Sequence, residues 1–282
     1  MEWKGRRGSR NIEDRRMTTG RAGGIGLVGM VIVLAVGYFF GIDISPLVSQ
    51  TGLGSPQEVS QQELTPEDKA AGEFVSVTLA DTEEVWADIF RSQVGRDYRP
   101  ATLVLYKGLT QSPCGGASGA TGPFYCPADR KVYLDTSFFT VMERKMGAGG
   151  EFAAAYVVAH EVAHHVQNEL GILPQVNQRR QQVGEVESND LSVRIELQAD
   201  CFSGVWARQA AEKFGTISEQ DIKDALNAAQ AVGDDMIARS AGARIPEEAF
   251  THGSSEQRAR WLATGLKDGN IEACDTFAAR AL

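Results

Sequence analysis

The chain has 282 residues, of which 43% are hydrophobic and 23% charged, a composition typical of a globular protein with material for a core. The net charge is −9, and because residues 1–22 carry +4, the remainder carries −13. Such an acidic body excludes nucleic acid as the main partner, since binding to phosphates requires a basic surface.

An uncharged run of 21 residues covers 22–42, between Arg21 and Asp43. At about 1.5 Å per helical residue, it is long enough to cross a hydrocarbon core of roughly 30 Å. A buried core helix would show a polar face, and a cleaved signal peptide usually has a shorter apolar region, so we expect one transmembrane helix. Seven basic residues precede it and Lys69 is the first to follow. The positive-inside rule therefore predicts a cytoplasmic segment 1–21 and a body on the other side of the membrane.

Residues 43–70 are rich in Ser, Gln, Pro and Gly and predict a linker. The body, residues 71–282, shows a helical spacing of apolar side chains over 82–94. A β-rich run at 101–108 and an alternating run at 130–135 predict two strands, the second open on one face. The Gly-rich segment 111–127 between them predicts a loop.

Helical patterns dominate the rest of the body. A helix is predicted over 137–146, and the next one contains three of the four histidines and ends at Gly171. Residues 172–190 predict a polar crossing segment. Further helices are predicted over 190–214, 218–238 (capped by Ser218) and 254–266. The predicted fold class is α+β, mainly helical with a small sheet.

All four cysteines follow the predicted membrane span, and an even number in an oxidising compartment favours disulfides. Four cysteines allow three pairings. We favour Cys114–Cys126, because that Gly-rich loop would otherwise be unconstrained, and this leaves Cys201–Cys274. A zinc site with cysteine ligands is the alternative, but the chain has no CxxC pair.

The segment 156–171, YVVAHEVAHHVQNELG, raises the possibility of a metal site. In the HExxH pattern, His160 and His164 are four residues apart, so a helix places both imidazoles on one face, where they can bind one cation. Glu161 is rotated by about 100° from them and borders the metal, where a base can take a proton from metal-bound water. His165 points elsewhere. The alternative is a chance match in a buried core helix.

A catalytic zinc needs a third protein ligand. The segment 194–207, RIELQADCFSGVWA, offers Glu196 and Asp200, again one helical turn apart. Glu196 can complete a His₂Glu ligand set, and Asp200 can accept the second N–H of a ligand histidine. A solvated acidic face is the alternative, but apolar neighbours predict burial, and buried carboxylates need a partner or a metal.

The segment 251–261, THGSSEQRARW, contains His252 just before a helix start and Arg258 one turn inside it. Either side chain is a candidate for stabilising the oxyanion of a tetrahedral intermediate. The alternative is that both tie the last helix to the body through carboxylates such as Asp200.

Together these segments resemble the bacterial neutral zinc metallopeptidases that have one N-terminal membrane anchor. The resemblance covers nearly the whole chain and rests on WKGRRGSRNIEDRR, HEVAHHVQ, ELQADCFSGVWA, FTHGSSEQR and ACDTF. It implies a zincin-like domain with one Zn²⁺ per chain, held by His160, His164 and Glu196. It further implies that Glu161 is the catalytic base and that Asp200 supports the ligands. We expect a single-pass protein of the bacterial inner membrane with a cytoplasmic N-terminus and a periplasmic or otherwise extracytoplasmic catalytic domain.

The predicted activity is hydrolysis of peptide bonds in a peptide or protein substrate. Glu161 would take the proton of zinc-bound water and deliver it to the leaving amine. The strand 130–135, with Tyr133, is a candidate edge for an extended substrate. One alternative is a catalytically inactive zinc-containing scaffold or binding protein, for which Glu161 is dispensable. Another is a module without metal, in which the histidines only pack.

Overall fold

The structure is a computed structural model that describes residues 1–17, 63–118 and 122–282. Met1–Asp14 and Thr65–Leu282 form one compact unit, and Arg15–Leu64 forms a second. The predicted transmembrane helix 22–42 and most of the predicted linker 43–70 lie outside the described residues. None of the helices within the described ranges is long and apolar enough to span a membrane.

A four-stranded sheet has the strand order β1 (Ile12–Asp14), β2 (Thr102–Tyr106), β6 (Lys131–Asp135), β5 (Phe124–Cys126). β1, β2 and β6 are parallel, and β5 is antiparallel to β6. The strands β3 (Leu109–Ser112) and β4 (Gly115–Ser118) pair separately. The positions of β2 and β6 confirm both predicted strands, but the predicted loop 111–127 contains β4, β5 and the end of β3. The prediction that 130–135 is open on one face is wrong, because β6 lies between β2 and β5 and its last four residues are buried.

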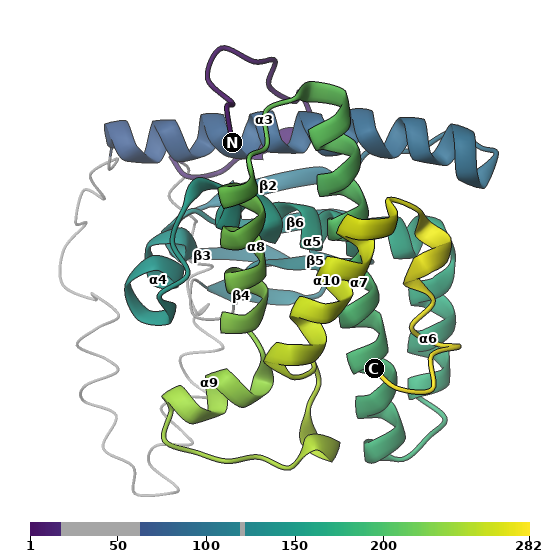
Figure 1. Cartoon of the computed structure of the whole chain (residues 1–282). Coiled ribbons are helices and arrows are strands. Elements are labelled where there is room, and N and C mark those ends of the chain that lie inside the picture. Colours follow the sequence, from purple (N-terminus) through teal and green to yellow (C-terminus); the bar gives the residue numbers. More distant parts are fainter. Residues whose placement is uncertain (18–62, 119–121) are drawn as a thin grey trace, which may run out of the picture. The chain divides into compact units, whose positions relative to one another are not determined.

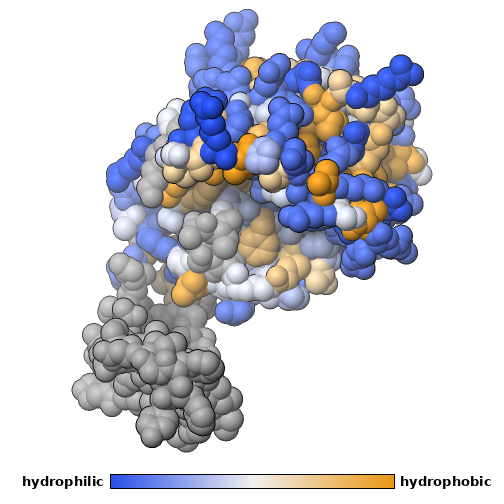
Figure 2. Space-filling model, turned by 90° about the horizontal axis from the view of Figure 1, so that it is seen from below, coloured by the Kyte–Doolittle hydropathy of each residue, from blue (hydrophilic) through white to orange (hydrophobic). Residues whose placement is uncertain are grey.

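Helices make up most of the large unit, so the mainly helical α+β class is confirmed (Figure 1). They are α3 (Pro66–Ile89), α4 (Ser137–Met146), α5 (Glu151–Glu169), α6 (Ile172–Arg180), α7 (Glu185–Phe214), α8 (Glu219–Ala231), α9 (Asp234–Ser240) and α10 (Ser255–Asp268). α5 packs against β5, β6, α7 and α8, and α10 lies beside α7. Seen from below, the surface is mainly hydrophilic, with apolar side chains gathered in smaller patches (Figure 2).

Three predicted boundaries are wrong. α3 begins at Pro66, well before 82 and inside the predicted linker, because Thr65 and Asp68 form a capping box. The predicted crossing segment 172–190 contains α6 and the first turns of α7. The predicted helix 218–238 is two helices that break at Gly233, whose backbone lies against α10. A Cβ on Gly233 would lie 2.3 Å from the backbone nitrogen of Ser255.

The N-terminal residues are part of the large unit, which corrects the prediction of a separate segment 1–21. β1 adds to the edge of the sheet beside β2, and Trp3 is only 6% exposed and packs edge-on against Phe74 of α3. Two of the basic residues that suggested a cytoplasmic segment, Arg6 and Arg7, pair with acidic residues of α3. Arg6 donates two hydrogen bonds to Asp81, at 2.6 and 2.7 Å. The acidic partners follow the N-terminal segment by more than 70 residues, so the local sequence does not reveal the pairing.

One disulfide and one close helix crossing hold α7 next to α10 and to the segment that follows α10. Both predicted disulfides, Cys114–Cys126 and Cys201–Cys274, are present. α7 and α10 cross at Gly204 and Gly265, where an added Cβ would lie 2.2 Å from the Leu262 carbonyl oxygen or 1.9 Å from that of Cys201. Glycine is therefore required at both positions for this close approach.

We expect Trp3→Ala to lower the free energy of unfolding by about 3 kcal/mol, because it empties a buried aromatic site. Urea denaturation of the purified full chain measures the change. The control is Arg10→Ala, an exposed position in the same segment, for which we expect a change within about 0.5 kcal/mol. Equal stability of the two variants would contradict the packing of residues 1–14 on the body.

Candidate metal centre

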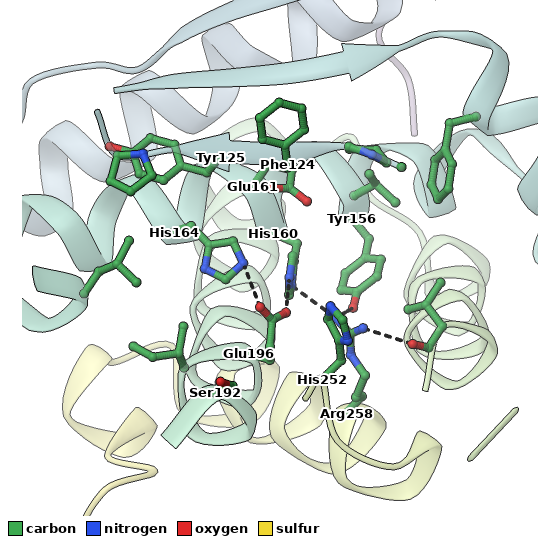
Figure 3. Close-up of a pocket in the computed structure, with 18 of the residues that line it drawn as sticks. Phe124, Tyr125, Tyr156, His160, Glu161, His164, Ser192, Glu196, His252 and Arg258 are labelled. Atoms are coloured by element: carbon green, nitrogen blue, oxygen red, sulfur yellow. Dashed lines mark hydrogen bonds and ion pairs between the residues drawn. The ribbon is translucent and has the colours of Figure 1, made fainter. Parts of the chain in front are cut away.

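Three side chains from two neighbouring helices converge at one end of a cavity (Figure 3). His160 and His164 lie on one face of α5, and Glu196 reaches them from α7. The Nε2 atom of His160 is 3.1 Å from one Glu196 carboxylate oxygen, and that of His164 is 3.4 Å from the other. One potential ligand atom from each residue lies within 4.8 Å of the others. The structure thus brings together the three ligands predicted from the sequence.

The second ring nitrogen of each histidine is engaged by an acceptor. His160 Nδ1 is 2.9 Å from a carboxylate oxygen of Asp200, and His164 Nδ1 is 2.9 Å from the amide oxygen of Gln167. If Nδ1 carries the proton in both rings, each Nε2 directs a lone pair toward Glu196. Two neutral imidazoles and a carboxylate are a common donor set for catalytic zinc, so these residues fit the metal that the sequence implies.

Asp200 is fully buried and accepts hydrogen bonds from a second layer of residues. Arg258 of α10 donates to it from Nε at 2.9 Å and from Nη2 at 3.0 Å, and Tyr156 donates its hydroxyl at 2.5 Å. Burial alone would raise the pKa of Asp200, but Arg258 and His160 outweigh it and hold that pKa below its ordinary value. Arg258 also donates to the Val232 carbonyl. Arg258 therefore ties α10 to α7, which is the alternative considered above, and Asp200, Tyr156 and the Val232 carbonyl engage most of its donors.

Glu161 lines the same cavity and is 8% exposed. Its carboxylate makes no hydrogen bond or ion pair with any residue in the described part of the chain. Burial raises the pKa of this carboxyl above its ordinary value. A carboxylate that is close to the histidines and uncommitted to a protein partner can accept a proton from water in the cavity.

His252 also lines the cavity, from the loop before α10, and its side chain is 53% exposed. Its Nδ1 is 3.2 Å from Asp234, which also accepts the backbone N–H groups of Thr251, His252 and Gly253 at 2.7–3.2 Å. Asp234 thereby holds the loop that presents His252. Sequence reasoning missed it because it precedes His252 by 18 residues and no motif joins the two.

The cavity has a volume of about 610 Å³ and is bordered by β5 through Phe124 and Tyr125. Tyr133 of β6 does not line it. The Tyr133 side chain is buried, donates a hydrogen bond from its hydroxyl to Asp129 at 2.6 Å, and stacks on Phe124. The role predicted for 130–135 and Tyr133 as the substrate edge is therefore wrong. His165 points away from the ligands, as expected, and contacts the Tyr125 hydroxyl and the Arg99 carbonyl.

We expect Asp234→Asn to lower the pKa of His252 and to destabilise the protein by about 1–3 kcal/mol near neutral pH. The hydrogen bond that His252 donates to Asp234 raises the pKa of His252. Burial raises the pKa of Asp234, but His252 and the backbone donors lower it to a net value below the ordinary one. The ion pair between Asp234 and His252 therefore stabilises the fold at pH values between the pKa of Asp234 and the pKa of His252. Its contribution is lost as pH falls through the pKa of Asp234 or rises through that of His252.

NMR titration of the His252 imidazole and thermal unfolding at several pH values measure both effects. An unchanged His252 pKa in the variant would contradict the assigned interaction.

The family model described as "Putative neutral zinc metallopeptidase" matches residues 1–277. The uncharacterised protein YpfJ of Escherichia coli K12 is 43% identical over 288 aligned residues, covering 98% of this chain and 99% of YpfJ. The uncharacterised protein Rv2575 of Mycobacterium tuberculosis is 45% identical over 195 residues, covering 66% of this chain and 65% of Rv2575. No solved structure matches the chain. The chain belongs to the neutral zinc metallopeptidase family that this model describes.

Proposed function

We propose that the chain is a zinc-dependent endopeptidase anchored to a membrane. The observation that carries this proposal is the convergence of His160, His164 and Glu196 on one point, with the uncommitted carboxylate of Glu161 in the same cavity. A structural zinc is usually enclosed by four protein ligands, whereas a catalytic zinc has three and faces an open position. Three ligands beside a cavity of about 610 Å³ therefore support a catalytic site.

The bound zinc would supply a Lewis acid that polarises the scissile carbonyl and lowers the pKa of water. Glu161 is the general base in this proposal. Its carboxylate takes the proton of the attacking water and delivers that proton to the nitrogen of the leaving amine. Asp200 and Gln167 orient the two histidines through their Nδ1 atoms and do not contact substrate.

His252 is the candidate for stabilising the oxyanion in this proposal. Its side chain is exposed to the cavity, and Asp234 keeps its Nδ1 occupied, so Nε2 is directed away from that partner. A protonated imidazole held in this way can donate to a carbonyl oxygen as negative charge develops there.

The substrate in this proposal is an extended peptide segment that lies along β5. Among the described strands, β5 pairs only with β6 and is the outer strand on that side of the sheet. An outer strand next to a reactive centre offers unpaired backbone groups to an extended chain, while the cavity accepts side chains. Apolar side chains line much of the cavity, including Phe138, Leu173 and Ile195, which favours apolar substrate residues.

We expect Glu161→Gln to abolish peptide hydrolysis while the protein still binds about one zinc per chain. Glu196→Ala removes a ligand, so we expect that variant to lose the zinc as well. Elemental analysis of the purified full chain measures the metal, and turnover of a quenched fluorescent peptide library measures activity. Glu187→Ala, at an exposed position on the same helix as Glu196, is the control. Full activity of Glu161→Gln would favour a scaffold in place of an enzyme.

We also propose that residues 22–42 attach the protein to the bacterial inner membrane without the single crossing expected from the sequence, so that residues 1–14 and the catalytic unit lie on the same side. A strand cannot pair with a sheet from across a membrane, so the pairing of β1 with β2 supports this arrangement over a cytoplasmic N-terminus. Two disulfides support the extracytoplasmic side, because cytosolic proteins rarely keep them.

Labelling of single introduced cysteines tests this topology. Arg10→Cys and Lys267→Cys lie at exposed positions of the N-terminal segment and of α10. We expect a membrane-impermeant maleimide to label both in intact spheroplasts, with lysed cells as the control. Labelling of only one position would contradict the shared side, and protection of both would contradict the extracytoplasmic location.

A further inference from the structure

The side chain of Gln167 is fully buried one helical turn after His164 and makes three polar contacts. Its Oε1 is 2.9 Å from His164 Nδ1. Its Nε2 is 2.8 Å from the backbone carbonyl of Ile195 and 3.1 Å from Oε1 of Gln198. This amide therefore links α5, which carries the two histidines, to the residues on either side of the Glu196 position in α7.

The directions of these hydrogen bonds follow from the acceptors at their far ends. A backbone carbonyl can only accept, so the Ile195 carbonyl requires the NH₂ group of Gln167 on its side. Gln198 donates in the same way to the Cys274 carbonyl at 3.1 Å, which turns its own oxygen toward Gln167. Two backbone carbonyls thus determine the orientation of both amides.

This orientation determines the tautomer of His164. The Oε1 atom of Gln167 can only accept, so the hydrogen bond requires a proton on His164 Nδ1. The lone pair of a neutral ring is then on Nε2, the atom that faces Glu196. Gln167 does not titrate, and its orientation depends only on the backbone.

The two ligand histidines therefore have supports of different chemistry. His160 is supported by the carboxylate of Asp200, whose charge Arg258 compensates. His164 is supported by a neutral amide. The last acceptor in this series of hydrogen bonds is the carbonyl of Cys274. Cys274 is covalently held, because it forms a disulfide with Cys201 of α7. The Gln167 amide is consequently fixed against the same helix that supplies Glu196.

We propose that Gln167 is a positioning residue of the metal centre. It holds His164 in the form with the proton on Nδ1 and keeps the ligands of α5 in place relative to Glu196. The inference rests on the metal site of the proposed function and is independent of peptide hydrolysis.

The test is the zinc affinity of the full chain carrying Gln167→Met, a replacement of similar size without hydrogen bonds. Competition with a chromogenic chelator measures the affinity. We expect it to fall about 10–100-fold, as is typical when the partner of a ligand histidine is removed. The control is Gln209→Met on α7, which loses one hydrogen bond to the Gly269 carbonyl away from the site. We expect its zinc affinity to stay within about twofold of wild type.

A second measurement on the wild-type chain does not depend on the folding of a variant. In the zinc-loaded protein labelled with ¹⁵N-histidine, we expect His164 to show a slowly exchanging proton on Nδ1. Its absence, or an unchanged zinc affinity of Gln167→Met, would overturn the role of Gln167 alone. A folded wild-type chain without zinc affinity would instead overturn the metal site itself.

Discussion

The buried carboxylate of Asp200 is the group on which the arrangement of the site depends. It lies on α7 and accepts hydrogen bonds from α5, through His160 and Tyr156, and from α10, through Arg258. A charge buried without such partners costs several kcal/mol, so the three helices must meet around it for the fold to be stable. Stability and the placement of a ligand histidine are therefore coupled through one residue.

The close contact between α7 and α10 makes this arrangement possible. Glycines at the crossing bring the two backbones together. Arg258, in the first turn of α10, therefore reaches Asp200. The disulfide from Cys201 to Cys274 adds a covalent link next to the same position. The polar groups behind the ligands are thus paired and packed, while Glu161 and His252 face the cavity. A rigid support behind an accessible reactive face is what precise orientation of metal ligands requires.

The N-terminal segment shows where local reasoning fails. Its charge predicts a solvated or cytoplasmic region, because each basic residue has few acidic neighbours in the sequence. In the structure the partners lie on α3, and Trp3 enters the core. The same limitation applies to 172–190 and to 218–238. Polar composition concealed α6, and the break at Gly233 results from contact with α10. The end of α5 at a glycine and both ends of α10, which has a capping box, were predicted within a few residues.

The sequence by itself determined two pairs of candidate ligand and support residues, since i,i+4 spacing on two helices places His160 with His164 and Glu196 with Asp200 whatever the surrounding fold. It also determined the dominant helices and both disulfides, and it indicated Glu161 as the candidate base. Only the tertiary structure brought the two pairs together at one point and added further supporting groups and an outer strand beside the cavity. Gln167, Asp234 and the outer strand β5 acquire their roles from contacts between distant segments. Local periodicity contains no information about such contacts, because they depend on how the helices and the sheet pack together.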